Sequence, residues 1–132
     1  MHKILVVDDE EFIRFTLKAA LEDRYTVFTC SDGAAALETI KKEKPVLVFL
    51  DITMQGMGGL ETLKKIKEAG LNPIIWMLTG VEEMDVVFKT LELGAAGYIS
   101  KPFDVEKIRS IALDAVGDTA PSDKPWVVKK KK

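Results

Sequence analysis

The chain has 132 residues, of which 47% are hydrophobic and 30% are charged, a composition typical of one globular domain with a proper core. Its formal net charge is −2 although its last four residues are all lysine, so the rest of the chain is strongly acidic and disfavours direct nucleic-acid binding. No apolar run approaches the roughly 20 residues of a membrane-spanning helix. The single cysteine, Cys30, cannot form an internal disulfide, so we expect a cytoplasmic protein that does not bind membranes.

Five short apolar runs predict β-strands. Their continuous isoleucine, valine, leucine and phenylalanine indicate burial on both faces, which is typical of a parallel sheet. In chain order, the predicted strands are Lys3–Val7, Thr26–Cys30, Val46–Leu50, Ile74–Leu78 and Gly97–Ile99.

Amphipathic segments lie between and after these runs, and apolar residues recur at helical spacing in five of them. Gly70 and Gly94 are placed to end two of the helices, while Pro45 and Pro73 lead into strands. The positions that mark the helices are Ile13, Leu17, Ala20 and Leu21; Ala36, Leu37 and Ile40; Leu60, Leu63 and Ile66; Val87, Leu91 and Leu93; and Ile108, Ile111, Ala112 and Val116.

Five alternating strand–helix pairs predict an α/β domain with a doubly wound parallel sheet over residues 1–116. From Gly117 onward the chain has linker composition and no helical period. Residues 117–132 are therefore expected to be a linker, a natural tail or an expression remnant.

Polar residues stand where four of the predicted strands end. Asp8 and Asp9 follow the first strand, Asp51 the third, Thr79 the fourth and Lys101 the fifth. In a doubly wound sheet the ligand site lies at this edge. Three converging carboxylates raise one another's pKa unless positive charge intervenes, and Mg²⁺ with a lysine would supply it. The set predicts phosphoryl transfer to Asp51 as nucleophile, with the Thr79 hydroxyl and Lys101 contacting the phosphoryl group.

Each of these residues also has an ordinary structural interpretation. Asp8 and Asp9 could cap a helix, Asp51 could be a turn residue, and Lys101 could be a surface lysine before a helix. A threonine at a strand end, such as Thr79, usually has no special role. Any one of the features is weak evidence. Their coincidence at the ends of four strands favours a functional site.

Four segments resemble the receiver domain of bacterial two-component response regulators, in the order and spacing of that family. They are "ILVVDDEE", "LVFLDITMQGMGGLE", "IIWMLTG" and "GAAGYISKPF", within residues 1 to 116. The resemblance implies a flavodoxin-like fold with five parallel strands in the order 2-1-3-4-5.

The resemblance also implies roles for single residues. It implies a phosphoacceptor at Asp51, and Mg²⁺ held by Asp9, Asp51 and the carbonyl of Thr53, with Asp8 contributing through water.

Two further roles concern the phosphorylated state. The resemblance implies that Thr79 and Tyr98 form a coupled switch and that Lys101 contacts the phosphate.

The implied function is that of a signalling switch, which catalyses only its own phosphorylation and dephosphorylation. The phosphoryl donor would be a phosphohistidine on a sensor histidine kinase or a histidine phosphotransfer protein. The face formed by the fourth helix, the fifth strand and the fifth helix would carry the signal to an effector domain, an effector protein or a second copy in a phosphorylation-dependent dimer.

The loop after Asp51 departs from the family pattern. The family usually has proline where this chain has Gln55, and often an acidic residue where it has Gly58. Gln55 removes a restraint on φ, and Gly56, Gly58 and Gly59 add freedom, so we expect a softer loop.

Three rival functions stay open at this point. A haloacid dehalogenase-type phosphatase would need a second aspartate two residues after Asp51, where the chain has Thr53. A flavodoxin-like module that binds FMN would need a Ser/Thr/Gly phosphate loop where the chain has "DDEE". A scaffold that is never phosphorylated would not need the strand-end residues together.

The first helix carries two phenylalanines away from its predicted buried face. Phe15 lies roughly 200° around the helix from Ile13, and Phe12 lies three residues before it. We expect the pair to form an apolar patch near Asp51 to which a kinase docks. The alternative is that Phe12 packs under the loop after the third strand and Phe15 is a lone exposed aromatic.

Overall fold

The structure is a computed structural model that describes residues 1–80 and 84–117. Strands and helices alternate along this part of the chain. The strands are β1 (Lys3–Val7), β2 (Thr26–Cys30), β3 (Leu47–Asp51), β4 (Ile74–Thr79) and β5 (Gly97–Ser100). The helices are α1 (Glu11–Leu21), α2 (Gly33–Glu43), α3 (Gly59–Glu68), α4 (Met84–Glu92) and α5 (Val105–Val116).

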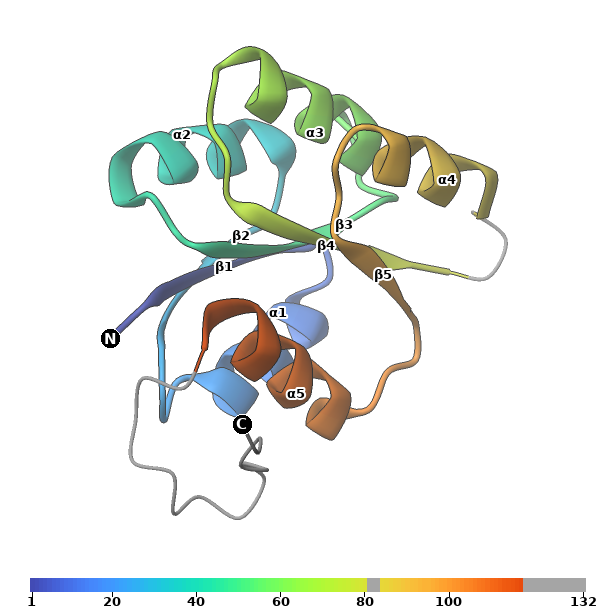
Figure 1. Cartoon of the computed structure of the whole chain (residues 1–132). Helices are drawn as coiled ribbons and strands as arrows, with labels where there is room; N and C mark the ends of the chain where they lie inside the picture. The colour runs from blue at the N-terminus through green and yellow to red at the C-terminus, as the bar shows by residue number, and fades with distance from the viewer. Residues whose placement is uncertain (81–83, 118–132) are drawn as a thin grey trace, which may run out of the picture.

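The strands form one parallel sheet in the order β2-β1-β3-β4-β5, which confirms the predicted fold class and strand order. Helices α1 and α5 cover one face of the sheet, and α2, α3 and α4 cover the other (Figure 1). The carboxyl ends of all five strands therefore point to the same edge of the sheet.

The apolar strands are buried on both faces, as their composition predicts. In β1, Leu5 and Val7 pack into the core under α2 and α3, whereas Ile4 and Val6 pack into the core under α1 and α5. All four side chains are fully buried. The alternation follows from the two-residue period of a strand, which sends successive side chains to opposite faces.

Helix ends carry the expected local signals. Asp32 and Asp104 cap α2 and α5 by accepting hydrogen bonds from backbone N–H groups at 2.8 and 3.0 Å. Gly70 and Gly94, predicted as helix stops, have φ of 75° and 104°. These left-handed values favour glycine, which has no Cβ.

Three strands run one residue further than the sequence predicts. In β3, Asp51 pairs with Leu78, and in β4, Thr79 pairs with Ser100. The parallel ladder continues past the apolar run because the next backbone groups still find partners, as where the Ile52 N–H donates to the Leu78 carbonyl at 2.9 Å. Asp51 and Thr79 are consequently the last residues of rigid strands.

The predicted tail, apart from Gly117, lies outside the described residues. Across residues 1–80 and 84–117, no helix is both long enough and apolar enough to cross a membrane.

Candidate functional site

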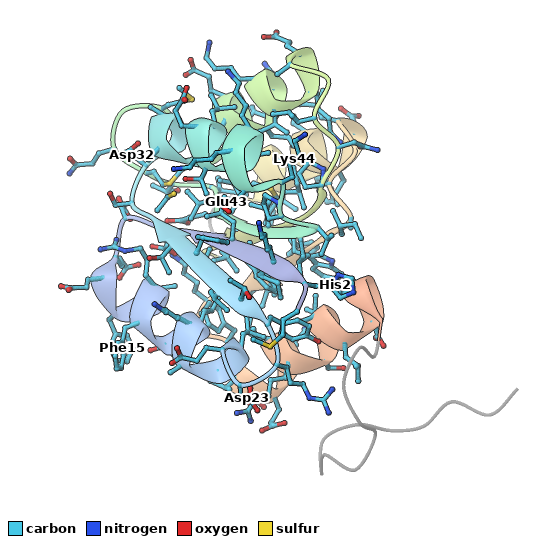
Figure 2. The ribbon with its side chains drawn as sticks, turned by 90° about the vertical axis from the view of Figure 1, so that its left-hand side faces the viewer. His2, Phe15, Asp23, Asp32, Glu43 and Lys44 are labelled. Carbon is cyan, nitrogen blue, oxygen red and sulfur yellow. The ribbon has the colours of Figure 1, made fainter. Side chains whose placement is uncertain are left out.

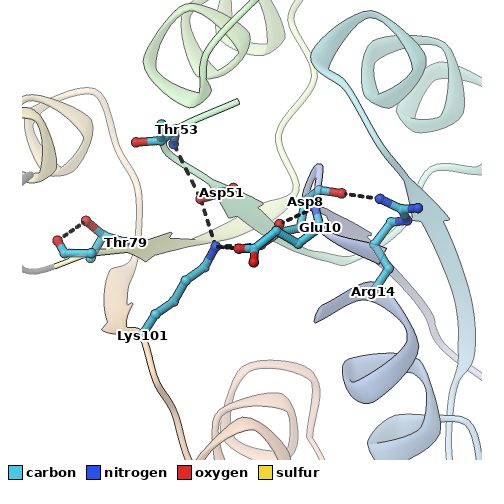
Figure 3. A network of polar contacts seen from close by, with 8 residues as sticks. Asp8, Glu10, Arg14, Asp51, Thr53, Thr79 and Lys101 are labelled. Atoms are coloured by element: carbon cyan, nitrogen blue, oxygen red, sulfur yellow. Dashed lines mark hydrogen bonds and ion pairs between the residues drawn. The ribbon is translucent and has the colours of Figure 1, made fainter. Parts of the chain in front are cut away.

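Side chains from the strand ends meet at one edge of the sheet (Figure 3). Lys101 Nζ lies 2.9 Å from Asp8 Oδ2, 3.3 Å from Asp51 Oδ1 and 3.3 Å from Glu10 Oε1. The Lys101 N–H donates to the Thr79 carbonyl at 2.7 Å, which fixes where the lysine leaves the sheet. The structure thus brings together the side chains of Asp8, Asp51 and Lys101, which the sequence places at three separate strand ends, while their chemical roles stay predictions.

Asp8 is fully buried and is held by its backbone as well as its side chain. Its N–H donates to the Cys30 carbonyl at 3.1 Å, and its carbonyl accepts from Arg14 Nη1 at 2.8 Å. Its Oδ1 accepts from the Glu10 N–H at 2.9 Å, which leaves Oδ2 to face Lys101.

The helix-capping interpretation of Asp8 and Asp9 is wrong. The residue at the cap position of α1 is Glu10, whose side chain makes no capping hydrogen bond. Asp9 is exposed, whereas the neighbouring Asp8 is fully buried.

Asp51 is 3% exposed, and a backbone N–H of the loop that follows it contacts its carboxylate. Its Oδ1 accepts from the Thr53 N–H at 3.3 Å. The loop returns at Gly59, whose N–H donates to the Ile52 carbonyl at 2.8 Å. A Cβ at Gly59 would overlap the carbonyl of Asp51 and lie 2.7 Å from the Cα of Ile52, so only glycine fits there. Close backbone approach, and not flexibility alone, accounts for that glycine.

Thr79 and Tyr98, the predicted switch pair, lie on neighbouring strands. The Thr79 hydroxyl is fully buried and donates to the Gly80 carbonyl at 2.8 Å (Figure 3). Tyr98 is 37% exposed and is the second residue of β5, not its end. The ladder places it opposite Met77, two residues before Thr79.

Burial and mutual contacts shift the pKa values of Asp51 and Lys101. The pKa of Asp51 is raised from 3.8 to about 7 as the net result of burial and the charge of Asp8, which both raise it, and of Lys101, which opposes them. Burial by itself would lower the pKa of Lys101, but its contacts with Asp8 and Asp51 outweigh this and raise the pKa above its usual value. Lys101 therefore stays charged, while Asp51 keeps its proton up to a higher pH than an exposed aspartate does.

Comparison with known proteins agrees with this geometry. The model of the response regulator receiver domain family matches residues 4–113. Sporulation initiation phosphotransferase F of Bacillus subtilis is 39% identical over 108 residues, which cover 81% of this chain and 87% of that protein. The receiver domain of NtrX from Brucella abortus superposes with a TM-score of 0.80 at 34% identity, covering 86% of this chain and 97% of that one.

The chain belongs to the response regulator receiver domain family. It also matches the alkaline phosphatase synthesis regulator PhoP of Bacillus subtilis, at 42% identity over 110 residues, but covers only 45% of that longer protein. Receiver domains are signalling modules that interact with histidine kinases or phosphotransfer proteins and bind Mg²⁺ at an acidic pocket.

The acidic groups of this receiver domain fit such a cation chemically. Within the described residues, oxygens of Asp8, Asp9 and Glu10 lie within 4.8 Å of one another. Carboxylate oxygens are the ligands that Mg²⁺ prefers. Asp8 Oδ2 has no hydrogen-bond partner there and is balanced only by the Lys101 ammonium, so a buried anionic oxygen is available.

Sequence reasoning missed two residues of the site. Glu10 contacts Lys101 at 3.3 Å. Arg14 anchors the Asp8 carbonyl. The adjacency of Glu10 to the aspartate pair was a usable signal, whereas nothing in the sequence indicates which backbone carbonyl an arginine on α1 will reach.

Phe12 and Phe15 are 75% and 71% exposed on α1. Phe15 points outward from that helix in Figure 2. Phe12 therefore does not pack under the loop after β3, and that part of the alternative interpretation is wrong. Docking of a kinase on these side chains stays a prediction.

Proposed function

We propose that the chain is a phosphoacceptor switch in which Asp51 takes a phosphoryl group from a phosphohistidine donor. The observation that carries this proposal is the contact of one lysine with two buried carboxylates, Asp8 and Asp51, at the end of a parallel sheet. Such an arrangement offers a nucleophile and a fixed positive charge at the same point.

The proposed reaction is a transfer between two acceptors. An oxygen of the Asp51 carboxylate forms the new P–O bond while the P–N bond of the donor histidine breaks, and the imidazole leaves with the electron pair. Lys101 contacts an oxygen of the phosphoryl group and offsets its charge. The Thr79 hydroxyl turns from the Gly80 carbonyl to donate to another of these oxygens.

We further propose that Asp9, Asp51 and the Thr53 carbonyl hold Mg²⁺, with Asp8 contributing through water. The cation supplies charge neutralisation for the carboxylates and for the incoming phosphoryl group. Support comes from the exposed Asp9 carboxylate beside buried Asp8 and from the raised pKa of Asp51, which a bound cation would lower.

The partners follow from this role. We propose a sensor histidine kinase or phosphotransfer protein as donor, docking near Phe12 and Phe15, and an effector or second copy at the α4-β5-α5 face. Release of the phosphoryl group to water, assisted by the same residues, would reset the switch. The free Cys30 thiol is compatible with a reducing cytoplasm as the compartment.

The rival functions are less well supported. Thr53 stands where a haloacid dehalogenase-type phosphatase would have its second aspartate, and its N–H is directed at Asp51 Oδ1. An FMN phosphate would meet the carboxylates of Asp8, Asp9 and Glu10 after β1, which repel an anion. A scaffold that is never phosphorylated would have no functional need for the buried contact between Asp51 and Lys101.

Acetyl phosphate labelling in the presence of Mg²⁺ tests the proposal. We expect one phosphoryl group per chain, lost in Asp51→Asn and on addition of EDTA. Asp9→Asn should label much more slowly, because a direct metal ligand is removed. Glu11→Gln is the matched control. It removes an exposed carboxylate two residues after Asp9 and should label normally.

Steady hydrolysis of a phosphomonoester would instead support the phosphatase. Full labelling of Asp51→Asn would overturn the proposed acceptor.

A further inference from the structure

A groove of about 460 Å³ lies at the edge of the sheet opposite to Asp51, where β3 and β4 begin. Its lining is largely apolar and comes from the last turn of α2 and the two loops that lead into these strands. The apolar residues are Ile40, Pro45, Val46, Leu71, Pro73 and Ile74.

Two side chains of this lining are unusually open for their position. Val46 and Ile74 are 36% and 37% exposed, although Val46 directly precedes β3 and Ile74 begins β4, two inner strands of the sheet. The backbone beneath them is rigid, since the Ile74 N–H donates to the Val46 carbonyl and the Val46 N–H to the Lys3 carbonyl, both at 2.9 Å. The groove is therefore a preformed apolar surface.

The helix ends beside the groove are rich in lysine although the chain as a whole is acidic. Helices α2 and α3 both end at this edge, and the last turns and the residue that follows α2 carry five lysines: Lys41, Lys42, Lys44, Lys65 and Lys67. Two acidic residues, Glu43 and Glu68, stand in the same segments, and Glu43 is already paired with Lys3 at 3.1 Å. Lysines therefore outnumber the carboxylates that could neutralise them.

Two of these lysines are held beside the apolar lining. Lys44 lines the groove itself, and Figure 2 shows it at the end of α2 away from Asp32, which caps the other end. Lys67 Nζ lies 3.3 Å from Oδ1 of Asn72, a neutral residue of the lining. No carboxylate is among the described residues that line the groove. An occupant would meet apolar contacts on the floor and two ammonium groups at the rim.

We propose that this groove docks an acidic peptide segment of a second protein, whose apolar side chains enter the groove while its carboxylates face Lys44 and Lys67. Charge complementarity carries the choice of occupant. The chain's own residues 118–132 contain five lysines and two aspartates, so their charge opposes binding at a cationic rim. Because Asp51 lies at the other end of the strands, this docking leaves the proposed phosphoryl site accessible and does not depend on it.

A synthetic amphipathic peptide of glutamates and leucines tests the proposal on the full chain. We expect amide NMR shifts concentrated at Val46, Leu71 and Ile74, with binding weakened by salt because the attraction is between charges at the protein surface. A peptide with the leucines replaced by serines, and one with the glutamates replaced by lysines, should not produce these shifts.

Charge reversal supplies the decisive control. The double variant Lys44→Glu/Lys67→Glu should lose about tenfold or more of its affinity for the peptide. Lys18→Glu/Lys107→Glu, which reverses two exposed lysines on α1 and α5, should bind normally. The neutral double variant Lys44→Gln/Lys67→Gln should lose an intermediate amount of affinity. It separates the effect of charge from a folding defect in the charge-reversed variant.

Three outcomes would overturn the proposal. They are peptide shifts scattered over the surface, binding that is equal in the charge-reversed and control variants, and shifts produced at the groove by phosphatidylserine vesicles but not by the acidic peptide. The last outcome would assign the surface to a membrane.

Discussion

Lys101 Nζ lies 3.3 Å from Asp51 Oδ1, and this contact joins the end of β3 to the segment after β5. The same ammonium lies closer to Asp8 Oδ2, at 2.9 Å. One positive charge is thus shared between two buried carboxylates, which is too little to keep both ionised without cost. The pH behaviour of the metal-free protein follows from this imbalance.

Asp51→Asn should stabilise the metal-free protein at pH 8 and have a much smaller effect at pH 4. Folding raises the pKa of Asp51 from 3.8 to about 7, so between these values the folded chain binds more protons than the unfolded chain. The stability contributed by the protonated carboxyl is complete below pH 3.8 and is lost as the pH rises through 7.

Thermal unfolding in EDTA at the two pH values measures this difference. Glu38→Gln, which removes an exposed carboxylate from α2, is the control and should change stability little at either pH. Equal effects of Asp51→Asn at pH 4 and pH 8 would contradict the raised pKa.

Gly59→Ala should destabilise the protein strongly, by on the order of 2–4 kcal/mol, because the new methyl group would force the backbone at Asp51 to move. The matched control is Gly58→Ala. Its Cβ would lie 3.4 Å from the Ile52 carbonyl, and its φ of −73° suits alanine, so a change below about 1 kcal/mol is expected. Urea unfolding of both variants gives the two free energies of unfolding. Similar losses of stability would show that the close backbone approach at Gly59 does not exclude a Cβ.

Tyr98 should change its χ1 and its exposure when beryllofluoride, a phosphoryl mimic, binds with Mg²⁺. The physical reason is that the Thr79 hydroxyl must leave the Gly80 carbonyl to reach the mimic, which vacates space beside β5. Tyr25, which is 4% exposed and lies on the other side of the sheet, is an internal control. Ring NMR signals of the two tyrosines should separate the cases, and an unchanged Tyr98 would remove the coupled switch.

Phe15→Ala should slow phosphotransfer from the cognate kinase by about tenfold or more while leaving acetyl phosphate labelling intact, because only a protein donor needs the surface. Phe88→Ala serves as the control, since Phe88 is 59% exposed on α4, on the other face of the sheet. If Phe15→Ala affects both donors equally, or neither, Phe15 is not a docking residue.

Much of the fold could be predicted because its signals are local. The continuous apolar runs indicated the strands, and Gly70 and Gly94 marked helix ends that the structure confirms by their positive φ. The ends of β3, β4 and β5 could not be predicted to the residue. Asp51 and Thr79 extend their strands through ladder hydrogen bonds with neighbours that are distant in sequence.

The core members of the site could be predicted, but not all of its residues or their contacts. Strand-end positions were enough to group Asp8, Asp51 and Lys101. The contact of Lys101 with Glu10 depends on side-chain rotamers and on how α1 leaves β1, which no local pattern encodes. The anchoring of Asp8 by Arg14 depends on the same packing.

Chemical mapping of the phosphoryl group tests the central claim most directly. Borohydride reduces an aspartyl phosphate to homoserine, so acetyl phosphate treatment with Mg²⁺, followed by borohydride and peptide mass spectrometry, marks the acceptor. We predict homoserine at position 51 alone, in the peptide that contains Leu50 and Ile52. Homoserine at position 8 or 9 with Asp51 intact would contradict the account.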